Sequence, residues 1–235
     1  MSVKKMLTSF QEKIGYSFNE PELLRTALTH SSYANEYTLK KIHHNERLEF
    51  LGDAVLEVVS SEFLFTGHPE MSEGKMSRKR ASLVCEPTLA FCAREMGLGD
   101  YLLLGRGEDL GGGRDRDSIL SDALEAVIGA VYLDGGLEPA RNFIMTYILN
   151  DSDSKVMFQD SKTILQEMLQ KDHKEPISYE LVDSTGPEHH REFVIEVKLG
   201  DRVLGTGKGK TIKAAGQQAA YQAIKDLKEK ENARG

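Results

Sequence analysis

The sequence predicts a multidomain chain in which an all-α domain is followed by a smaller α+β domain with α-β-β-β-α order. Up to about residue 149, apolar side chains recur with helical spacing. Residues 150–154 are then polar and aperiodic. Beyond them, the run at 193–197 is rich in Phe, Val and Ile, which is typical of strands. We therefore expect domains at 1–150 and 160–230, joined by a linker at 151–159.

The composition is typical of a soluble globular protein, because 40% of the 235 residues are hydrophobic and 29% are charged. No stretch approaches the roughly 18 uncharged apolar residues of a membrane-spanning helix, and the N-terminus lacks an apolar signal core. We therefore expect a cytoplasmic protein with no membrane partner. Cys85 and Cys92 lie in one predicted helix, where they cannot easily pair, so we expect both to be core thiols.

The helices of the first domain follow from apolar periodicity and from the Gly and Pro residues that end them. They are expected over residues 2–15, 20–30, 45–65, 76–96, 119–133 and 139–149. Residues 29–44 are polar and predict a loop or short helix. The glycine-rich segment 97–117 predicts a mobile surface loop.

The second domain combines two helices with three short strands. A helix is expected at 161–172, strands at 177–183, 191–199 and 202–207, and a final helix at 211–229. The pairs Gly186-Pro187 and Gly200-Asp201 mark the turns between strands. A unit of this size suits three antiparallel strands backed by two helices.

The helix at 45–65 has an unusual composition. Apolar side chains recur on more than one side of it, which predicts a largely buried helix. Yet Glu46, Glu49 and Asp53 stand at i, i+3 and i+7 and share one stripe. Carboxylates are costly among apolar groups unless something neutralises them. Mg²⁺ is a natural partner, because it is a hard ion that takes carboxylate, water and phosphate oxygens.

A second acidic pair repeats this pattern. Asp122 and Glu125 are three apart in the apolar helix at 119–133. One such pair is usually a solvated helix face, but two acidic stripes in apolar helices predict a shared cation pocket. The histidines at 30, 43 and 44 are poorer candidates, since hard ions prefer oxygen ligands.

The net charge of −7 is unfavourable for a nucleic-acid-binding protein, which usually carries a basic footprint. The excess of acids lies in residues 1–150, with 16 basic against 22 acidic side chains, while 151–235 hold 14 against 15. Four cations in the first domain lie close together, at Lys75, Arg78, Lys79 and Arg80. They fit a solvated helix face and a phosphate contact about equally well.

From Asn45 to Leu56 the chain resembles ribonuclease III, the family of double-stranded-RNA endonucleases, whose defining motif is an Asn-Glu-Arg-Leu-Glu-Phe-Leu-Gly-Asp run. The resemblance continues at Glu73 with 76–78, at 104–108, and at 117–122 with Glu125-Ala126. The second domain resembles a double-stranded RNA-binding domain. Its hallmarks here are Lys162-Thr163, Leu165-Gln166-Glu167, Gly186-Pro187-x-His189 with Phe193, and 207–213 with Ala215 and Ala219-Ala220.

The resemblance implies a magnesium-dependent endoribonuclease, with Mn²⁺ as a substitute ion. Glu49, Asp122 and Glu125 would hold the metal, Asp53 would support it or its water, and Glu125 and Asp53 are the expected catalytic pair. Glu46 and Glu73 would line the same valley. One metal would activate a water and a second would stabilise the leaving 3′ oxygen.

The family leaves 5′-phosphate and 3′-hydroxyl ends, works as a homodimer and processes rRNA precursors, mRNA and tRNA. The residues expected to contact RNA in the second domain are Thr163, Gln166, Glu167, His189, Lys208, Lys210 and Lys213. The chain departs from the family at Ile212, where a basic residue is common, and at Gly216, where Glu is common. We therefore expect one phosphate contact to be lost or moved to Lys210.

The alternative is a non-catalytic RNA-binding protein, because related domains can lose their acids and persist as structural parts of ribonucleoproteins. Here every expected acid is present. Duplex RNA cleavage with and without magnesium separates the two hypotheses.

Overall fold

The computed structural model describes residues 2–37, 42–150, 161–170, 175–185, 192–209 and 211–232. Contacts divide the chain into two compact units, Met1–Ser152 and Asp153–Gly235. The first unit is helical and the second combines a sheet with two helices. The predicted fold class is confirmed. The predicted linker at 151–159 lies outside the described residues.

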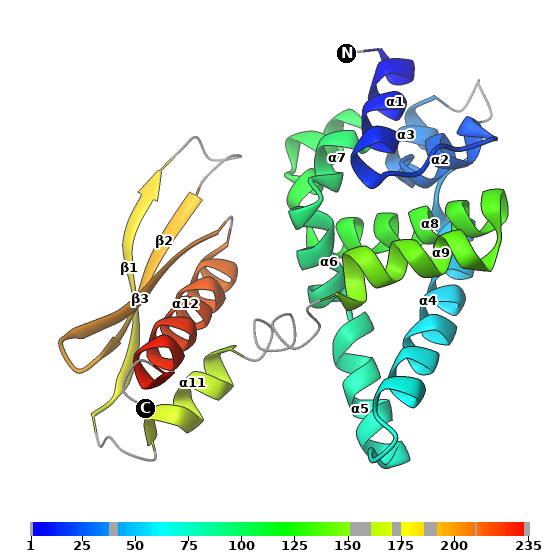
Figure 1. The fold of residues 1–235 in the computed structure, drawn as a ribbon. Coiled ribbons are helices and arrows are strands. Elements are labelled where there is room, and N and C mark those ends of the chain that lie inside the picture. The colour runs from blue at the N-terminus through cyan, green and yellow to red at the C-terminus, as the bar shows by residue number, and fades with distance from the viewer. Residues whose placement is uncertain are drawn as a thin grey trace. The chain divides into compact units, whose positions relative to one another are not determined.

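The first unit consists of helices packed around α8 (Figure 1). Its helices are α1 (Val3–Ile14), α2 (Pro21–Ala27), α3 (Ser31–Glu36), α4 (Glu46–Gly67), α5 (Glu73–Val84), α6 (Glu86–Glu95), α7 (Arg106–Leu110), α8 (Asp117–Gly135) and α9 (Leu137–Ile144). Short helical turns follow at η2 (Leu98–Tyr101), η3 (Gly113–Asp115) and η4 (Met145–Leu149). Helix α8 is apolar on nearly every side and is contacted by α2, α4, α6 and α9.

Among the described helices, α4 and α8 share the most extensive contact. Two glycines permit it. A Cβ atom at Gly52 would lie 1.8 Å from the carbonyl oxygen of Glu125, and one at Gly129 would lie 2.3 Å from that of Leu48. Both distances are far shorter than any real contact, so the two backbones approach each other closely only because these side chains are missing. The close packing predicted for Gly52 is therefore present.

Two local predictions for the first unit were wrong. The helix expected at 76–96 is interrupted at Cys85, whose backbone is extended, and α6 begins anew with Pro87 in its first turn. Proline lacks the N–H that would continue the preceding helix. As a result Cys92 is buried, as expected, but Cys85 is only partly buried. The segment 97–117, expected to be a loop, contains η2, α7 and η3.

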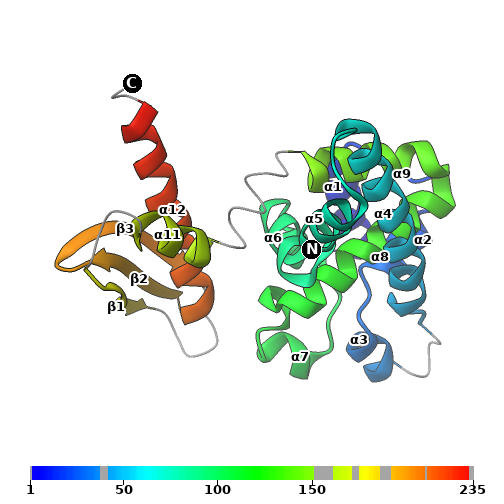
Figure 2. The same ribbon diagram turned by 90° about the horizontal axis from the view of Figure 1, so that it is seen from below.

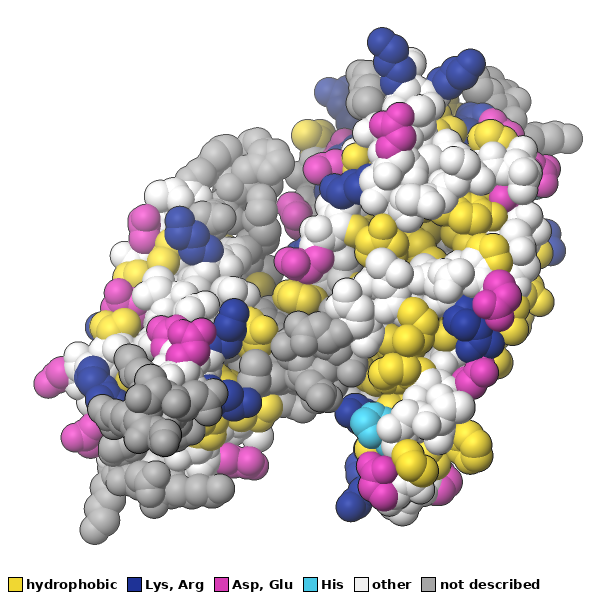
Figure 3. Space-filling model, viewed as in Figure 1, with side chains coloured by type: hydrophobic (Ala, Val, Ile, Leu, Met, Phe, Trp, Pro, Cys, Tyr) yellow, Lys and Arg dark blue, Asp and Glu magenta, His cyan; other side chains and the backbone are white. Residues whose placement is uncertain are grey.

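Helix α4 is also less buried than its composition predicted. Its inner face packs against α8, but the side chains of Phe50, Val58 and Phe65 are 82%, 57% and 72% exposed. With Ala54, which is also exposed, they follow the helical spacing of one outer face. We call this set the α4 stripe. Figure 3 shows hydrophobic side chains at the surface over α4 and α5.

The second unit is a three-stranded antiparallel sheet in the order β1-β2-β3, covered on one face by two helices (Figure 2). Its elements are α11 (Ser161–Gln170), β1 (Ile177–Thr185), β2 (Glu192–Leu199), β3 (Arg202–Gly209) and α12 (Ile212–Asn232). Ile177 lies opposite Leu199, and Phe193 opposite Gly209. The core beneath the helices joins Leu165, Ile195 and Val197 to four alanines of α12.

Over the described part of the chain, every helix is too short or too polar to cross a bilayer.

Replacing Gly52 with Ala is expected to destabilise the first unit by about 3 kcal/mol, the upper end of the usual cost of overpacking, because a clash with a rigid backbone cannot be relieved by side-chain movement. Gly67→Ala is the matched control on the same helix, since a Cβ there meets nothing within 4 Å, and it should change stability by less than about 1 kcal/mol. Chemical denaturation of the full chain measures both. Equal stability of the two variants would contradict this packing.

Candidate active site and RNA-binding surface

Three carboxylates meet where α4 crosses α8. Glu49 comes from the first turn of α4, while Asp122 and Glu125 come from α8 and stand one turn apart. One carboxylate oxygen from each lies within 4.8 Å of the other two. All three side chains are partly buried. Two segments more than 70 residues apart in the chain thus form one acidic pocket.

The glycine contacts between the two helices place the acids at this spacing. Gly52 lies against the backbone of Glu125, so Glu49, one turn before Gly52, reaches the same level of α8. The start of α4 is fixed separately, because the backbone N–H of the buried Asn45 donates to the carbonyl of Thr29 at 2.9 Å. Both ends of the acidic stretch of α4 are therefore anchored.

The pocket is electrostatically unfavourable when nothing neutralises it. Burial, followed by the charges of Asp53, Asp122 and Glu49, raises the pKa of Glu125 to about 8. Burial and neighbouring acids also raise the pKa of Glu49. The pKa of Asp122 is raised chiefly by burial, against a hydrogen bond donated by Ser121. Near neutral pH the pocket avoids three adjacent charges by keeping a proton on Glu125.

The remaining predicted acids are not part of this cluster. Asp53 is exposed one turn further along α4, although its charge acts on both Glu49 and Glu125. Glu46 is exposed and lies 3.8 Å from the Nδ1 atom of His44.

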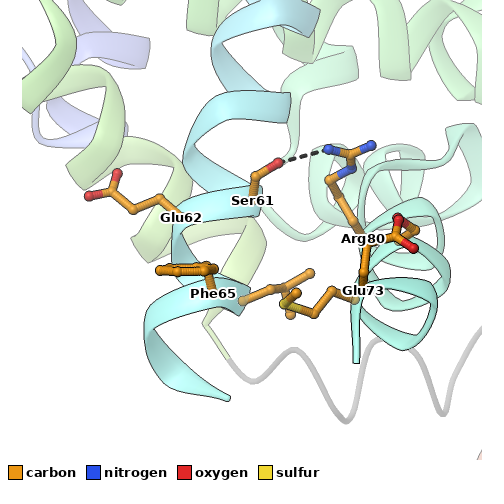
Figure 4. Close-up of a pocket in the computed structure, with 8 residues that line it drawn as sticks. Ser61, Glu62, Phe65, Glu73 and Arg80 are labelled. Atoms are coloured by element: carbon orange, nitrogen blue, oxygen red, sulfur yellow. Dashed lines mark hydrogen bonds between the residues drawn. The ribbon is translucent and has the colours of Figure 1, made fainter. Parts of the chain in front are cut away.

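Glu73 does not lie beside the acidic cluster. At the start of α5 it accepts a hydrogen bond from Ser77 at 2.8 Å and lines a groove of about 520 Å³ between α4 and α5. The groove reaches α4 at Ser61 and Phe65, about 18 and 24 Å along the helix from Glu49 at 1.5 Å per residue. Figure 4 shows Arg80 hydrogen-bonded to Ser61 beside it. Within one chain, Glu73 therefore lies apart from the acidic cluster, and its place in the expected valley stays a prediction.

The acidic cluster suits a divalent cation. Three carboxylate oxygens at this spacing are hard ligands of the type that Mg²⁺ and Mn²⁺ prefer. Burial and repulsion from neighbouring acids raise the pKa of all three carboxyls, and a cation would relieve that repulsion. A pocket of this kind, partly open to solvent, leaves positions for water and phosphate oxygens. It is the arrangement needed for metal-assisted hydrolysis of a phosphate ester.

The predicted RNA contacts that the structure describes lie on the helices of the second unit and on β3. The side chains of Thr163, Gln166 and Glu167 are exposed on α11. Lys208 is exposed near the end of β3, and Lys213 in the first turn of α12. His189 and Lys210 lie outside the described residues.

Two family models match the chain, and together they cover both units. Residues 20–152 match the Ribonuclease-III-like family, and residues 161–227 match the double-stranded RNA binding motif. The first match alone spans more than half of the 235 residues. The chain belongs to the ribonuclease III family. Members of this family are endoribonucleases that cut double-stranded RNA, and this chain holds both the nuclease domain and the RNA-binding domain.

Relatives of known name agree with this assignment. Ribonuclease 3 of Caldanaerobacter subterraneus subsp. tengcongensis is 49% identical over 225 residues, which cover 94% of this chain and 98% of the relative. Ribonuclease 3 of Bacillus cereus is 49% identical over 224 residues, covering 94% and 91%. A crystal structure of the ribonuclease III nuclease domain from Campylobacter jejuni superposes with a TM-score of 0.56 at 42% identity, covering 61% of this chain and 94% of that domain.

The ribonuclease III pocket has two neighbours outside the acidic stripes, namely Glu86, which sequence reasoning missed, and His30, which it considered only as a poor metal ligand. The charges of Glu86 and His30 act on Asp122, in opposite directions. The His30 ring is held by Ser32, whose backbone N–H donates to Nδ1 at 3.2 Å. Neither residue lies near the acidic motifs in the sequence, and no local pattern marks it.

We expect the pH dependence of stability to reveal Glu125 when divalent metal is removed by a chelator. Its pKa in the fold, about 8, exceeds the ordinary value of 4.5, so between these values the folded carboxyl keeps a proton that the unfolded chain releases. The stabilisation is complete below about pH 4.5 and is lost as the pH rises through about 8. The unfolding temperature of the wild type should therefore fall more steeply over this interval than that of Glu125→Gln. Parallel profiles would contradict the assignment.

Proposed function

We propose that this ribonuclease III cuts double-stranded RNA by magnesium-assisted hydrolysis, leaving 5′-phosphate and 3′-hydroxyl ends. The observation that carries the proposal is the convergence of Glu49, Asp122 and Glu125 within 4.8 Å. These residues would hold Mg²⁺, for which Mn²⁺ could substitute. When bound, the ion supplies Lewis-acid chemistry, lowering the pKa of a water and stabilising charge on the phosphate.

The protein residues have separate tasks in this proposal. Glu125 would release its proton to solvent when a cation is held here, because the positive charge would offset the burial and the repulsion that raise its pKa. Asp53 is exposed beside the cluster, where its carboxylate can orient a water through a hydrogen bond. Glu46, in the first turn of α4, adds to the negative field at the same mouth. The residues place the scissile bond and the water.

The RNA-binding domain, which we place at 160–230, docks the duplex for the nuclease domain at 1–150. A-form RNA is recognised mainly by its shape, its 2′-hydroxyls and its phosphates. The exposed polar face of α11, with Thr163, Gln166 and Glu167, suits the minor groove. Lys208, Lys210 and Lys213 suit phosphates, and His189 is a further contact to the RNA.

The active enzyme is a homodimer in this proposal. The α4 stripe is an unpaired apolar face with an adjoining groove, and both are features of surfaces that are covered in an assembly. We favour a second copy of this chain as the partner that covers the α4 stripe, because a solved structure of the related Campylobacter jejuni domain describes a region involved in dimer formation. Glu73 borders the groove, so dimerisation also brings this acid towards the partner chain.

The substrates are structured precursors in the cytoplasm, namely rRNA precursors together with mRNA and tRNA. Two features support this class. The cluster can hydrolyse a phosphodiester without reading a base, and the RNA-binding domain follows duplex shape rather than sequence. Mapping of cleavage sites on total RNA from cells with and without the protein tests the choice of substrates.

Glu125→Gln should reduce cleavage of a labelled hairpin RNA at least about a hundredfold, because losing a metal ligand removes several kcal/mol of charge stabilisation. Binding of the same hairpin in chelator should be unchanged. Glu12→Gln is the matched control, since Glu12 is exposed on α1 and forms no ion pair with a described residue. Gel analysis of the hairpin with and without Mg²⁺ measures cleavage by both variants. Undiminished cleavage by Glu125→Gln would end the assignment, and a wild type that binds but never nicks would leave the binding-only alternative.

Phe50→Asp should convert the dimer to a monomer. Burying a phenylalanine contributes about 1.5–3 kcal/mol, and a dimer with twofold symmetry contains it twice, so we expect dissociation to become at least about a hundredfold easier. Leu110→Asp is the control, because Leu110 is 64% exposed but lies on α7, away from the α4 stripe. Sedimentation equilibrium separates the outcomes. Equal masses for both variants and the wild type would exclude this interface.

A further inference from the structure

Lys162 has no role among the RNA contacts considered so far, yet it is held in a defined position. It lies in the first turn of α11 and is exposed. Its Nζ atom is 4.8 Å from the ring centre of Tyr179 on β1, which is a cation–π distance. On α12, a Cβ at Gly216 would lie 2.9 Å from Nζ and 3.2 Å from Cε. The missing side chain at Gly216 therefore provides the space that the lysine occupies.

The ammonium group of Lys162 has no carboxylate partner among the residues that the structure describes. Its position is also unfavourable for the helix itself, because a cation in the first turn meets the positive end of the helix dipole. No acid compensates in the first turn of α11 or in that of α12. The ring of Tyr179 stabilises the charge without neutralising it. A positive charge is thus kept available to an anion.

The surroundings of Lys162 are those of the predicted RNA contacts. The hydroxyl of Ser161 donates to the carbonyl of Gln217 at 2.9 Å, so the start of α11 lies against the beginning of α12. Lys213 precedes Gly216 by three residues and shares its helix face. On α11, Gln166 follows Lys162 by one turn on the exposed face. Two ammonium groups from neighbouring helix starts therefore lie near the polar face of α11.

We propose that Lys162 is a further RNA phosphate contact of this domain, positioned by Tyr179 and by the space at Gly216. The inference rests on the proposed binding of double-stranded RNA. It also connects the two departures from the family pattern. Ile212 lacks the common positive charge, and a glutamate at position 216 would stand beside Lys162 and pair with it. Because position 216 is glycine and not glutamate, the positive charge of Lys162 stays available to the RNA and replaces the one that Ile212 lacks.

The test is binding of a duplex RNA of about 20 base pairs to the full chain in chelator, measured by fluorescence anisotropy at several KCl concentrations. Lys162→Met keeps the length of the side chain and removes its charge. Near 0.1 M salt it should weaken binding about three- to tenfold, and the slope of log affinity against log salt should fall by about one. Lys225→Met is the control, because Lys225 is also exposed and lies 5.8 Å from the ring of Tyr221, but in the middle of α12. It should change neither quantity.

The outcomes separate this inference from the function on which it rests. If the wild type binds the duplex and Lys162→Met binds it as tightly as Lys225→Met does, Lys162 is not an RNA contact. If the wild type binds no duplex, the RNA-binding proposal fails and this inference fails with it. If Lys162→Met lowers the unfolding temperature and weakens binding by one factor at every salt concentration, the lysine is only structural and the inference is overturned.

Gly216→Glu tests the role of the glycine. It should weaken binding of the same duplex, because the new carboxylate pairs with Lys162 and withdraws its charge from the RNA. In the Lys162→Met background the same substitution should have a smaller effect, which a double-mutant cycle detects. Strictly additive effects would show that position 216 does not act through Lys162.

Discussion

The close approach of α4 and α8 is the constraint on which the nuclease domain depends. At Gly52 and Gly129 the two backbones touch where other residues would carry side chains. That contact stabilises the core, and it also sets the distance between acids that repel one another. The free energy of packing offsets the electrostatic cost of the pocket. A protein that brings like charges together in this way needs a rigid scaffold, and the buried helix α8 provides it.

The sequence was informative where chemistry and periodicity agreed. The acids of two apolar helices predicted a shared pocket, and Glu49, Asp122 and Glu125 meet within 4.8 Å. The α-β-β-β-α order of the second domain was predicted because strand composition and turn residues reinforce each other. The resemblance to ribonuclease III is confirmed by the family models. The roles of the individual site residues remain predictions.

The errors have identifiable physical causes. The basic and apolar pattern predicted one helix through Cys85, but α5 ends at Val84 and a new helix starts with Pro87 in its first turn. The many glycines of 97–117 led to the prediction of a loop, although the segment contains three short helical stretches. Glycine content indicates backbone conformational freedom and does not specify a conformation. The most informative error concerns Phe50 and Val58, which are apolar but exposed. Periodicity cannot tell whether an apolar face packs within one chain or against another, and Glu73, beside that face, could not be placed for the same reason.

The contact between β3 and α12 in the RNA-binding domain is built from very small side chains. Gly205, Gly207 and Gly209 of β3 lie directly under α12, and a Cβ on any of them would come within 2.6 Å of the helix backbone. The helix meets them with Ala215, Ala219 and Ala223. Such residues lose almost no rotamer entropy on folding, but they leave no flexible atom that could move aside. At these positions the domain therefore tolerates the loss of a methyl group better than the addition of one. Substitutions there are limited by side-chain volume more than by hydrophobicity.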